Sequence, residues 1–540
     1  MTLKARIENG VVFPPYPSEP VPEISLYQVV EECLGQHGNR TAVVFGDEDI
    51  TFAELLTLFQ RYAAGFQRHG VQKGEKILAH LDNSLENYIA MYSVIFAGGV
   101  VVCSYPVLSN GDPVISSSSN ARSAMTILKS IGEMTAPCGT PMMFLHLGPF
   151  SRPTATSKGY FATGTVPGFI SVTEFKKLNE SSYQEPTVDD VKNEVVVLFY
   201  TSGTTGRPKA VEHTHYSIVA TLPRPRSGLT LSDDKVVAFR FNITYASGFR
   251  IFLRVSCSGA KIILLSSLAC AEDILDALRK YKAFSMFAVS AILWHRKLGM
   301  ALRTQKIHGD SIELLLYSGV YMNATKAHRL HLSHSILSCK RVNSLRKRIA
   351  FKPLDGGGLR RQMRIHKTHI VDMKNGNVLG PNEKGEALVK SPSSMRGYYG
   401  NPEATSQAIT PDGWVRTGDI CYYDEIGQFF FVERLNQMFR CMGVFVAPSL
   451  IENILLNHEG VADVGVIGVP HPTYREAAMA FVVLKNDSSK VTEAELQDFV
   501  AGQLGSHMHL HGGVKFVHAI PKDESGKVNR KKLRMLQKED

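Results

Sequence analysis

Apolar positions along the chain alternate between a strand-like and a helix-like period. Residues 42–50, AVVFGDEDI, are rich in β-branched and aromatic residues around a turn, and they predict a pair of short strands. Thr51 and Glu54 then form a capping box. Behind it, apolar residues recur at helical spacing and predict an amphipathic helix whose buried face contains Leu55, Leu56, Phe59, Tyr62, Ala63 and Phe66. The run KILAHL at 76–81 returns to a strand.

The uncharged segment from Asn87 to Gly111 is about as long as a bilayer crossing, so a membrane helix is one interpretation. Its internal pattern favours another. Gly98 and Gly99 separate a helix-like LENYIAMYSVIFA from a β-branched VVVCSY, which is typical of a helix followed by a buried strand. The sequence therefore predicts no transmembrane segment here.

The same alternation continues with a strand at 261–266, KIILLS, and a helix at 271–281, AEDILDALRKY, which indicates an α/β fold. Residues 110–157 are poorly patterned and predict loops. After Asp424 the pattern changes to a smaller unit. Its predicted elements are strands at 461–469 and 477–485 and a helix that begins with a second capping box, Thr492 and Glu495.

The length and composition of the chain indicate how many domains it has and in which compartment it lies. The chain has 540 residues, of which 44% are hydrophobic, and this length exceeds what one core usually serves, so we expect two or more domains. The first twenty residues lack the apolar core of a secretory signal. The eight cysteines show no paired spacing, which indicates reduced thiols and a cytoplasmic protein.

The net charge of +10 comes almost entirely from one stretch. Residues 340–367 contain ten Lys or Arg and a single Asp, so they supply +9. A basic patch of this size is compatible with nucleic-acid binding, but no aromatic platform or nucleic-acid motif accompanies it. We therefore expect no nucleic-acid partner.

The stretch LFYTSGTTGRPKAVEHTH, residues 198–215, has the composition of a phosphate-binding loop. Glycines allow backbone N–H groups to approach an anion, Ser and Thr hydroxyls donate hydrogen bonds, and Lys209 adds positive charge. A flexible surface linker has a similar composition. The strand-like EVVVLF in front of it favours the phosphate loop. It is not a Walker A loop, because no Gly-Lys-Ser/Thr follows.

This stretch resembles the phosphate-loop motif of the adenylate-forming superfamily, which includes acyl- and aryl-CoA synthetases, beetle luciferase and peptide-synthetase adenylation domains. DGWVRTGD at 412–419 is similar to the ribose-binding motif of that family, and PKDESGKVNRKKLR at 521–534 to its C-terminal lysine motif. RGYYGNPEAT, VAPSLIE and VIGVPHPTYREAAMAFVV resemble the branch of luciferase and 4-coumarate-CoA ligase. The three motifs occur in the family's order and span nearly the whole chain.

The resemblance implies an α/β fold with a large multi-sheet N-terminal domain and a small α+β C-terminal lid. The expected boundaries are 1–433 for the large domain, 434–437 for a hinge and 438–540 for the lid. The implied reaction activates a carboxylic acid with ATP and transfers the acyl group to coenzyme A, with Mg²⁺ as the metal. We expect these small molecules as partners; the oligomeric state stays open.

The motifs also imply binding residues. Phosphates of ATP would be held by Thr201, Ser202, Gly203, Thr204, Thr205, Gly206 and Lys209. Asp419 would accept both ribose hydroxyls, because a carboxylate offers two acceptor oxygens, and Arg434 is a second candidate for the same sugar. Taken alone, Asp419 could also be an ordinary turn residue after Gly418.

The resemblance implies that Lys527 is the catalytic residue, a lysine that swings in with the lid to bridge the acyl carboxylate and the α-phosphate. Taken alone, a lysine in a basic C-terminal stretch is a solvated surface residue. The sequence ends in LQKED, without the Ser-Lys-Leu peroxisomal signal of some relatives.

One expected motif is absent. The family carries Tyr-Gly-x-Thr-Glu after the YSG at 317–319, where it supplies an adenine platform, an α-phosphate ligand and a magnesium ligand. Here no glutamate occurs between Glu313 and Glu383, and Asp355 is the carboxylate nearest the expected place. Consequently the sequence predicts no metal-binding residue. Phe241-Asn242 replaces the usual Phe-His, and Asn436 occupies the hinge position, which predicts altered substrate preference and lid kinetics.

His328, His331, His334 and Cys339 are residue types that bind zinc, but their spacing matches no closed zinc motif, so we interpret them as polar residues of a helix. The sequence therefore predicts an ATP-dependent carboxylate–CoA ligase, an acid–thiol ligase acting through an acyl-adenylate. The alternative is an impaired member that binds nucleotide or acyl ligand without efficient turnover.

Overall fold

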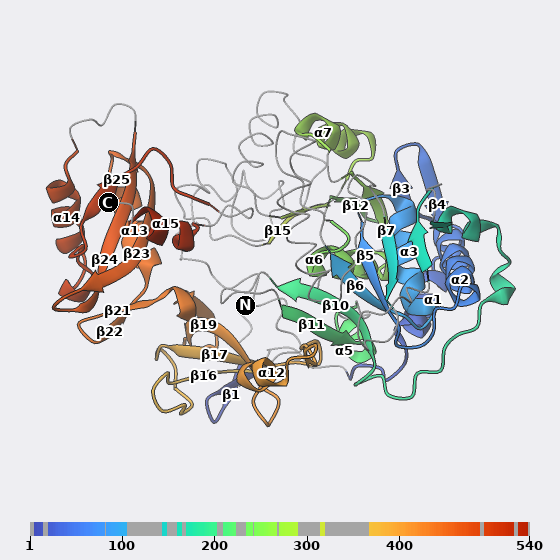
Figure 1. Ribbon diagram of the computed structural model, residues 1–540, viewed down its shortest axis with the longest axis horizontal. Helices are drawn as coiled ribbons and strands as arrows, with labels where there is room; N and C mark the ends of the chain where they lie inside the picture. Colours follow the sequence, from blue (N-terminus) through green and yellow to red (C-terminus); the bar gives the residue numbers. More distant parts are fainter. Residues whose placement is uncertain are drawn as a thin grey trace.

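The computed structural model describes residues 5–13, 20–81, 83–104, 143–147, 159–164, 169–201, 209–222, 234–240, 242–266, 269–283, 285–289, 314–318, 367–485, 491–522 and 528–537. These residues form four β-sheets with helices packed beside them (Figure 1). The predicted α/β class is confirmed. The last of the four sheets contains only strands that follow residue 438, and these strands with the helices beside them are called the C-terminal unit below.

The largest sheet has the strand order β18-β11-β10-β6-β5-β7-β8-β9. Its central strands β10, β6 and β5 are parallel, so their carboxyl ends meet at one edge, while β11 lies antiparallel to β10. The bounds are β5 Lys76–His80, β6 Val100–Ser104, β7 Met143–Leu147, β8 Gly159–Ala162, β9 Ile170–Ser171, β10 Val195–Thr201, β11 Lys209–Thr214 and β18 Gly397–Tyr398.

The second sheet has the order β15-β14-β12-β13-β3-β4 and is parallel except for the β3–β4 hairpin. Parallel strands are buried on both faces, which explains their continuous apolar runs. The bounds are β3 Thr41–Phe45, β4 Glu48–Thr51, β12 Val236–Phe239, β13 Lys261–Leu264, β14 Ser285–Val289 and β15 Leu314–Ser318.

The third sheet is antiparallel, with the order β1-β2-β16-β17-β19-β20. Its strands are β1 Arg6–Glu8, β2 Val11–Phe13, β16 Lys367–Val371, β17 Gly385–Lys390, β19 Val415–Tyr423 and β20 Phe429–Arg434. The fourth sheet has the order β22-β21-β24-β23, with β25 beside β24. Its strands are β21 Phe439–Cys441, β22 Val444–Val446, β23 Val461–His471, β24 Arg475–Leu484 and β25 Val514–Phe516.

The described helices cover the faces of these sheets. In the N-terminal part they are α1 Leu26–Gly35, α2 Phe52–Arg68, α3 Leu85–Phe96, α5 His215–Val219, α6 Ala246–Cys257, α7 Ala271–Lys280 and α12 Pro402–Ala408, with 3₁₀ turns η1 Val172–Lys177 and η2 Glu180–Ser182. In the C-terminal part they are η4 Leu435–Gln437, α13 Pro448–Asn457, α14 Glu493–Ala501, η5 Ser506–Met508 and α15 Arg530–Leu536. Buried residues of the two parts form separate apolar clusters.

Several local predictions are confirmed. The strand pair at 42–50 is β3–β4, and the Thr51–Glu54 capping box starts α2, with the Thr51 side chain accepting from the Glu54 N–H. The segment from Asn87 contains α3, buried on all sides, and the strand β6. Within the parts of the chain that are described, every helix is too short or too polar to cross a membrane.

The prediction of loops throughout 110–157 is wrong at one place. Met143–Leu147 forms β7, which pairs antiparallel with β5. A five-residue apolar strand gives a weak periodic signal, and here the pairing with β5 decides its conformation. The remainder of 110–157 lies outside the described residues.

Arg530 at the start of α15 holds the C-terminal unit together. Its guanidinium donates to the Val466 carbonyl at 3.1 Å, to Gln437 Oε1 at 2.8 Å and to Glu452 Oε1 at 2.7 Å. The Arg530 and Glu452 side chains are only 12% and 13% exposed, and burial raises the pKa of Glu452. This one side chain therefore joins β23, α13 and η4.

We predict that Arg530→Met lowers the free energy of unfolding of the C-terminal unit by about 3 kcal/mol, because it leaves the Glu452 carboxylate buried without its cation. Thermal unfolding by circular dichroism and amide exchange in β23 and β24 measure this. Lys531→Met, which changes an exposed neighbour, is the matched control. Equal stability of the two variants would contradict the structural role of Arg530.

Candidate functional site

The two ends of the predicted phosphate loop lie side by side. Thr201 ends β10, Lys209 begins β11, and the two residues are paired across the strands. The intervening residues 202–208 must leave and return at this one point, the carboxyl end of a central parallel strand. Ligands of open α/β sheets bind outside such strand ends. The register therefore places the loop at an edge suited to a phosphate-containing ligand.

Lys209 is partly buried and its ammonium lies 5.1 Å from the centre of the Tyr398 ring in β18. The neighbouring β18 strand is tied to β11 by an ion pair of 2.9 Å between Arg396 and Glu212. These contacts fix the backbone from which Lys209 projects, so its charge is held at the mouth of the loop.

Asp419 lies in β19 at a β-bulge. The β17–β19 register shifts between Glu386 and Leu388, and Gly418 adopts a φ of +66°, a conformation that favours glycine. Glu386 holds the bulge, because its carboxylate accepts from Arg416 at 2.9 Å and from the Gly418 N–H at 3.2 Å. A bulge changes the direction of the side chain that follows it, here Asp419.

Asp419 and Arg434 are direct cross-strand neighbours in β19 and β20, and their side chains form an ion pair of 2.7 Å between Oδ1 and Nε. Arg434 also donates to the Thr417 carbonyl at 3.2 Å. Their side chains are 28% and 54% exposed, so both remain accessible to a ligand. The two predicted ribose residues, fifteen positions apart in sequence, are thus brought together.

Other predicted residues lie outside the described part of the chain. These are Ser202, Gly203, Thr204, Thr205, Gly206, Lys527, the four His and Cys residues of 328–339, and the basic stretch up to residue 366; the side chain of Thr201 also belongs here. Their roles remain predictions. Across the described ranges, no group of three or more His, Cys, Asp or Glu side chains is placed to bind a metal ion.

Asn242, which replaces the usual histidine, has a structural role. It is buried, its Oδ1 accepts from the Thr244 N–H at 2.8 Å and the Thr244 hydroxyl at 2.7 Å, and its Nδ2 donates to the Leu81 carbonyl at 3.4 Å. These bonds form the turn that leads into α6. Its side chain is therefore already used in positioning that helix.

Sequence reasoning missed a pair of basic residues beside β10. Arg250 of α6 donates from Nη2 to His213 of β11 at 2.7 Å. Burial lowers the pKa of Arg250 to about 10, so it stays charged at neutral pH, and burial together with Arg250 lowers the pKa of His213 to about 3. The one sequence signal that could have indicated this pair is the arginine in the otherwise apolar stretch GFRIFL, residues 248–253.

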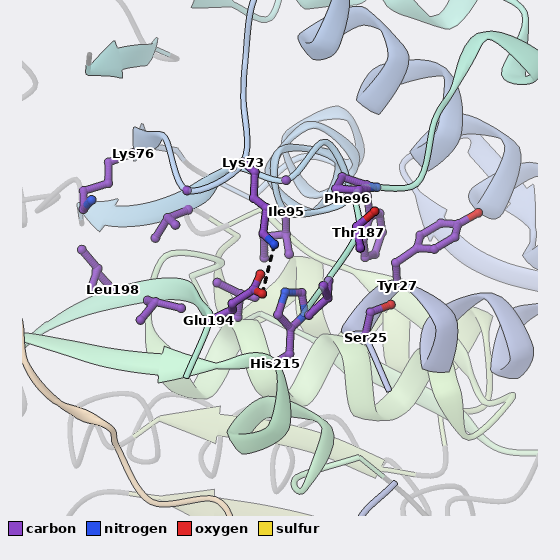
Figure 2. A pocket seen from close by; sticks show the side chains of 18 of the residues that line it. Ser25, Tyr27, Lys73, Lys76, Ile95, Phe96, Thr187, Glu194, Leu198 and His215 are labelled. Atoms are coloured by element: carbon purple, nitrogen blue, oxygen red, sulfur yellow. Dashed lines mark ion pairs between the residues drawn. The ribbon is translucent and has the colours of Figure 1, made fainter. Parts of the chain in front are cut away.

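A cavity of about 430 Å³ opens at the amino ends of β5, β6 and β10 (Figure 2). Lys73 and Glu194 form an ion pair of 3.0 Å beside it. His215 faces it, with Nδ1 accepting from the Leu26 N–H at 3.1 Å, and burial lowers the pKa of His215 to about 4. The loop at 202–208 leaves the opposite end of β10, so this cavity is separate from the predicted phosphate site.

The comparisons with known proteins match both parts of the chain. The sequence profile described as AMP-binding enzyme matches residues 30–331, and that of the AMP-binding enzyme C-terminal domain matches 450–527. A peroxisomal OPC-8:0-CoA ligase 1 from Arabidopsis thaliana is 28% identical, with 96% of this chain and 94% of that protein covered.

Two further relatives cover nearly the whole length. A luciferin 4-monooxygenase from Nipponoluciola cruciata is 26% identical over 98% of each chain. The crystal structure of ATP-bound MatB from Rhodopseudomonas palustris superposes with a TM-score of 0.71 at 21% identity, covering 95% of this chain and 99% of that one. The latter likeness shows that the two chains share a fold.

We predict that Asp419→Asn weakens ATP and AMP binding by about 10- to 100-fold, because an amide replaces one of two acceptor oxygens by a donor and removes the charge. Calorimetric titration of both nucleotides measures this. Glu425→Gln, an exposed change in the turn after β19, is the control and should leave the dissociation constants unchanged. Unaltered nucleotide affinity in Asp419→Asn would remove Asp419 from the site.

Proposed function

Because the chain belongs to the AMP-binding enzyme family, we propose that it is an ATP-dependent carboxylate–CoA ligase that acts through an acyl-adenylate. CoA ligases of this family use ATP, Mg²⁺ and coenzyme A. The observation that carries the proposal is the pairing of Thr201 with Lys209, which closes a Gly-, Ser- and Thr-rich loop at the carboxyl end of β10.

The proposed reaction has two steps. A carboxylate oxygen of the acid attacks the α-phosphorus of ATP, and the bond to the β-phosphate oxygen breaks, so pyrophosphate leaves. The thiolate of coenzyme A then attacks the acyl carbon, and AMP leaves with the bonding electrons. Catalysis of such transfers rests on positioning and on stabilising negative charge, which is the chemistry of the proposed residues.

Within this proposal each motif has one task. Residues 201–206 and Lys209 hold the phosphates. Asp419 accepts from the ribose hydroxyls, and Arg434, ion-paired to it, orients the carboxylate. Lys527 neutralises the reacting oxygens in the first step. The domain boundaries at 433 and 438, with a hinge at 434–437, belong to the same proposal.

The magnesium ligand has no assigned residue. No described group of acidic side chains fits a metal ion, and the sequence between Glu313 and Glu383 has no glutamate. We therefore route no step through Mg²⁺. Loss of one charge-stabilising group costs on the order of 3 kcal/mol, or about a hundredfold in rate. The missing glutamate therefore favours a second candidate function, a nucleotide- or acyl-binding protein with little turnover.

A pyrophosphate-release assay with fatty and aromatic acids, run with and without Mg²⁺, separates the two candidates. We expect acid-dependent, metal-dependent release at a rate reduced by the missing glutamate. ATP binding by calorimetry without release from any acid would favour the second candidate. Absence of ATP binding as well would contradict both.

We predict that Lys527→Ala lowers the rate of adenylation by at least about a hundredfold, because it removes the cation that stabilises the transition state of the first step. Thioester formation from a supplied acyl-adenylate should change much less. Lys531→Ala, also in the C-terminal basic motif, is the control. Equal loss in both half-reactions would remove this role from Lys527.

A further inference from the structure

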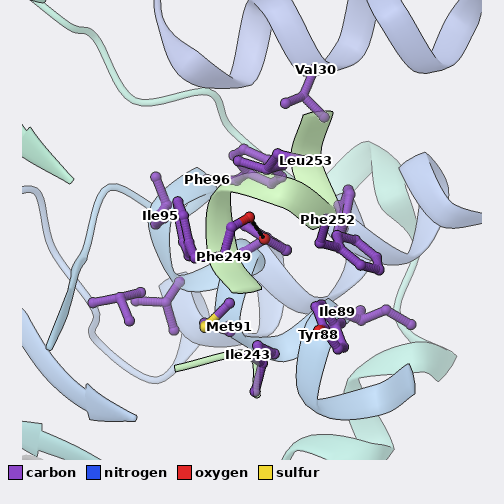
Figure 3. Packing of buried hydrophobic residues seen from close by; sticks show 14 of the residues in the cluster. Val30, Tyr88, Ile89, Met91, Ile95, Phe96, Ile243, Phe249, Phe252 and Leu253 are labelled. Atoms are coloured by element: carbon purple, nitrogen blue, oxygen red, sulfur yellow. Dashed lines mark hydrogen bonds between the residues drawn. The ribbon is translucent and has the colours of Figure 1, made fainter. Parts of the chain in front are cut away.

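Arg250 is held in place by the packing of α6. Phe249 and Phe252, its neighbours on α6, are fully buried against α3 (Figure 3). The Phe252 ring stacks on Tyr88 with 4.1 Å between centroids, and the Tyr92 hydroxyl donates to the Phe249 carbonyl at 2.7 Å. The guanidinium therefore projects from a fixed helix and cannot turn away without unpacking the core.

Among the described residues, the charge of Arg250 has no anionic partner. Its bonds are to the His213 ring, and neither an ion pair nor a nearby acidic group accompanies it among the described residues. Nε is enclosed and makes no hydrogen bond, while the residue as a whole is half-buried. An enclosed cation without a counter-ion is costly, so a structural arginine at such a position normally pairs with a carboxylate.

The His213 ring positions the Arg250 guanidinium but carries no negative charge that could neutralise it. Its Nε2 accepts from Arg250, and its Nδ1 lies 3.3 Å from the Ser217 hydroxyl, which accepts from the Thr214 N–H and donates to the Thr214 carbonyl. Arg250 Nη2 also lies 3.2 Å from Nδ1, so both ring nitrogens face this one guanidinium nitrogen. Among the described residues Nη1 makes no hydrogen bond, which leaves it for a further acceptor.

The pair lies on the same face of the strand as the predicted phosphate site. Side chains two positions apart in a strand point to the same face, so one face of β11 carries Lys209, Val211 and His213. The Lys209–Thr201 pair lies at the end of β11 that follows the predicted phosphate loop. His213 lies four positions after Lys209 in the strand, a distance of about 13 Å along it. Because Arg250 contacts His213, its guanidinium lies against the face of β11 from which Lys209 also projects.

We propose that Arg250, positioned by His213, is the subsite for a second anionic group of the carboxylic acid, so that the substrate class is an acid with a distal carboxylate. The planar guanidinium offers two parallel N–H groups to a carboxylate, which gives a bidentate, charge-assisted pair. This inference rests on the proposed function, since it places the acid between the phosphate loop and α6.

The experiment compares matched acids in two assays. Succinic, adipic and suberic acids are each paired with the straight-chain monocarboxylic acid of the same length. Calorimetric titration measures their binding to the full chain with ATP absent and present, and pyrophosphate release measures kcat/KM. The proteins are the wild type, Arg250→Met, Arg250→Lys, and Arg254→Met as the control one turn along α6.

We expect at least one diacid to bind the wild type tighter than its matched monoacid, by about 10- to 100-fold. Arg250→Met should abolish that preference. Arg250→Lys should retain part of it, and Arg254→Met all of it. Should Arg250→Met fail to fold, Arg250→Lys provides the comparison: a diacid preference smaller than that of the wild type supports the subsite, and an unchanged preference overturns it.

Failure of this inference is distinguishable from failure of the proposed function. In one outcome the wild type releases pyrophosphate with monoacids, and diacids have no advantage in either assay. That result overturns the proposed subsite, while the ligase proposal stands. In a second outcome diacid binding depends on Arg250, but no acid leads to release of pyrophosphate. That result supports the subsite and contradicts the proposal that the protein is an efficient ligase. No preference for diacids in binding overturns the subsite whether or not pyrophosphate is released.

Discussion

The antiparallel pairing of Thr201 with Lys209 is the constraint on which the proposed site depends. A loop that begins and ends at one point of a sheet cannot drift from it, and here that point is the carboxyl end of a strand flanked by parallel neighbours. The same register fixes the face on which Lys209 and His213 lie. The positions of the proposed phosphate loop, of Lys209 and of the proposed acid subsite therefore follow from one strand alignment, and α6, packed on α3, supplies Arg250.

The elements that the sequence predicted are those whose signal is local. The Thr51 capping box and the apolar spacing behind it give α2, and the β-branched run at 461–469 gives most of β23. β7 was missed, because a five-residue strand is decided by its pairing with β5 rather than by its own pattern. Motifs pointed to Asp419 and Arg434, but nothing in the sequence indicated that they form a cross-strand ion pair.

Arg250 shows the limit of motif reading. A single arginine in an apolar helix is compatible with a surface position, a buried ion pair or a ligand site, and only the tertiary contacts separate these. The structure supplies a neutral histidine where a structural ion pair would need a carboxylate. Asn242 shows the converse. Because the family usually has histidine at this position, the sequence predicted an altered substrate preference. In the structure the Asn242 side chain instead bonds to Thr244 and Leu81 and forms the turn before α6.

The contacts of Glu433 bear on how the two lobes could swivel. This buried carboxylate, the last but one residue of β20, accepts from the Ser449 N–H at 3.1 Å near the start of α13 and from the Arg434 N–H at 3.0 Å. Gln437 is bound to the C-terminal unit, because its Oε1 accepts from Arg530. If the proposed hinge operates, Leu435 and Asn436 are the residues that would absorb the rotation, and the Ser449–Glu433 bond would have to break first. Beside the proposed hinge, Ser449 is therefore tied to β20 twice, by the Glu433 carboxylate and by the Val432 carbonyl, which accepts from the Ser449 hydroxyl at 3.5 Å.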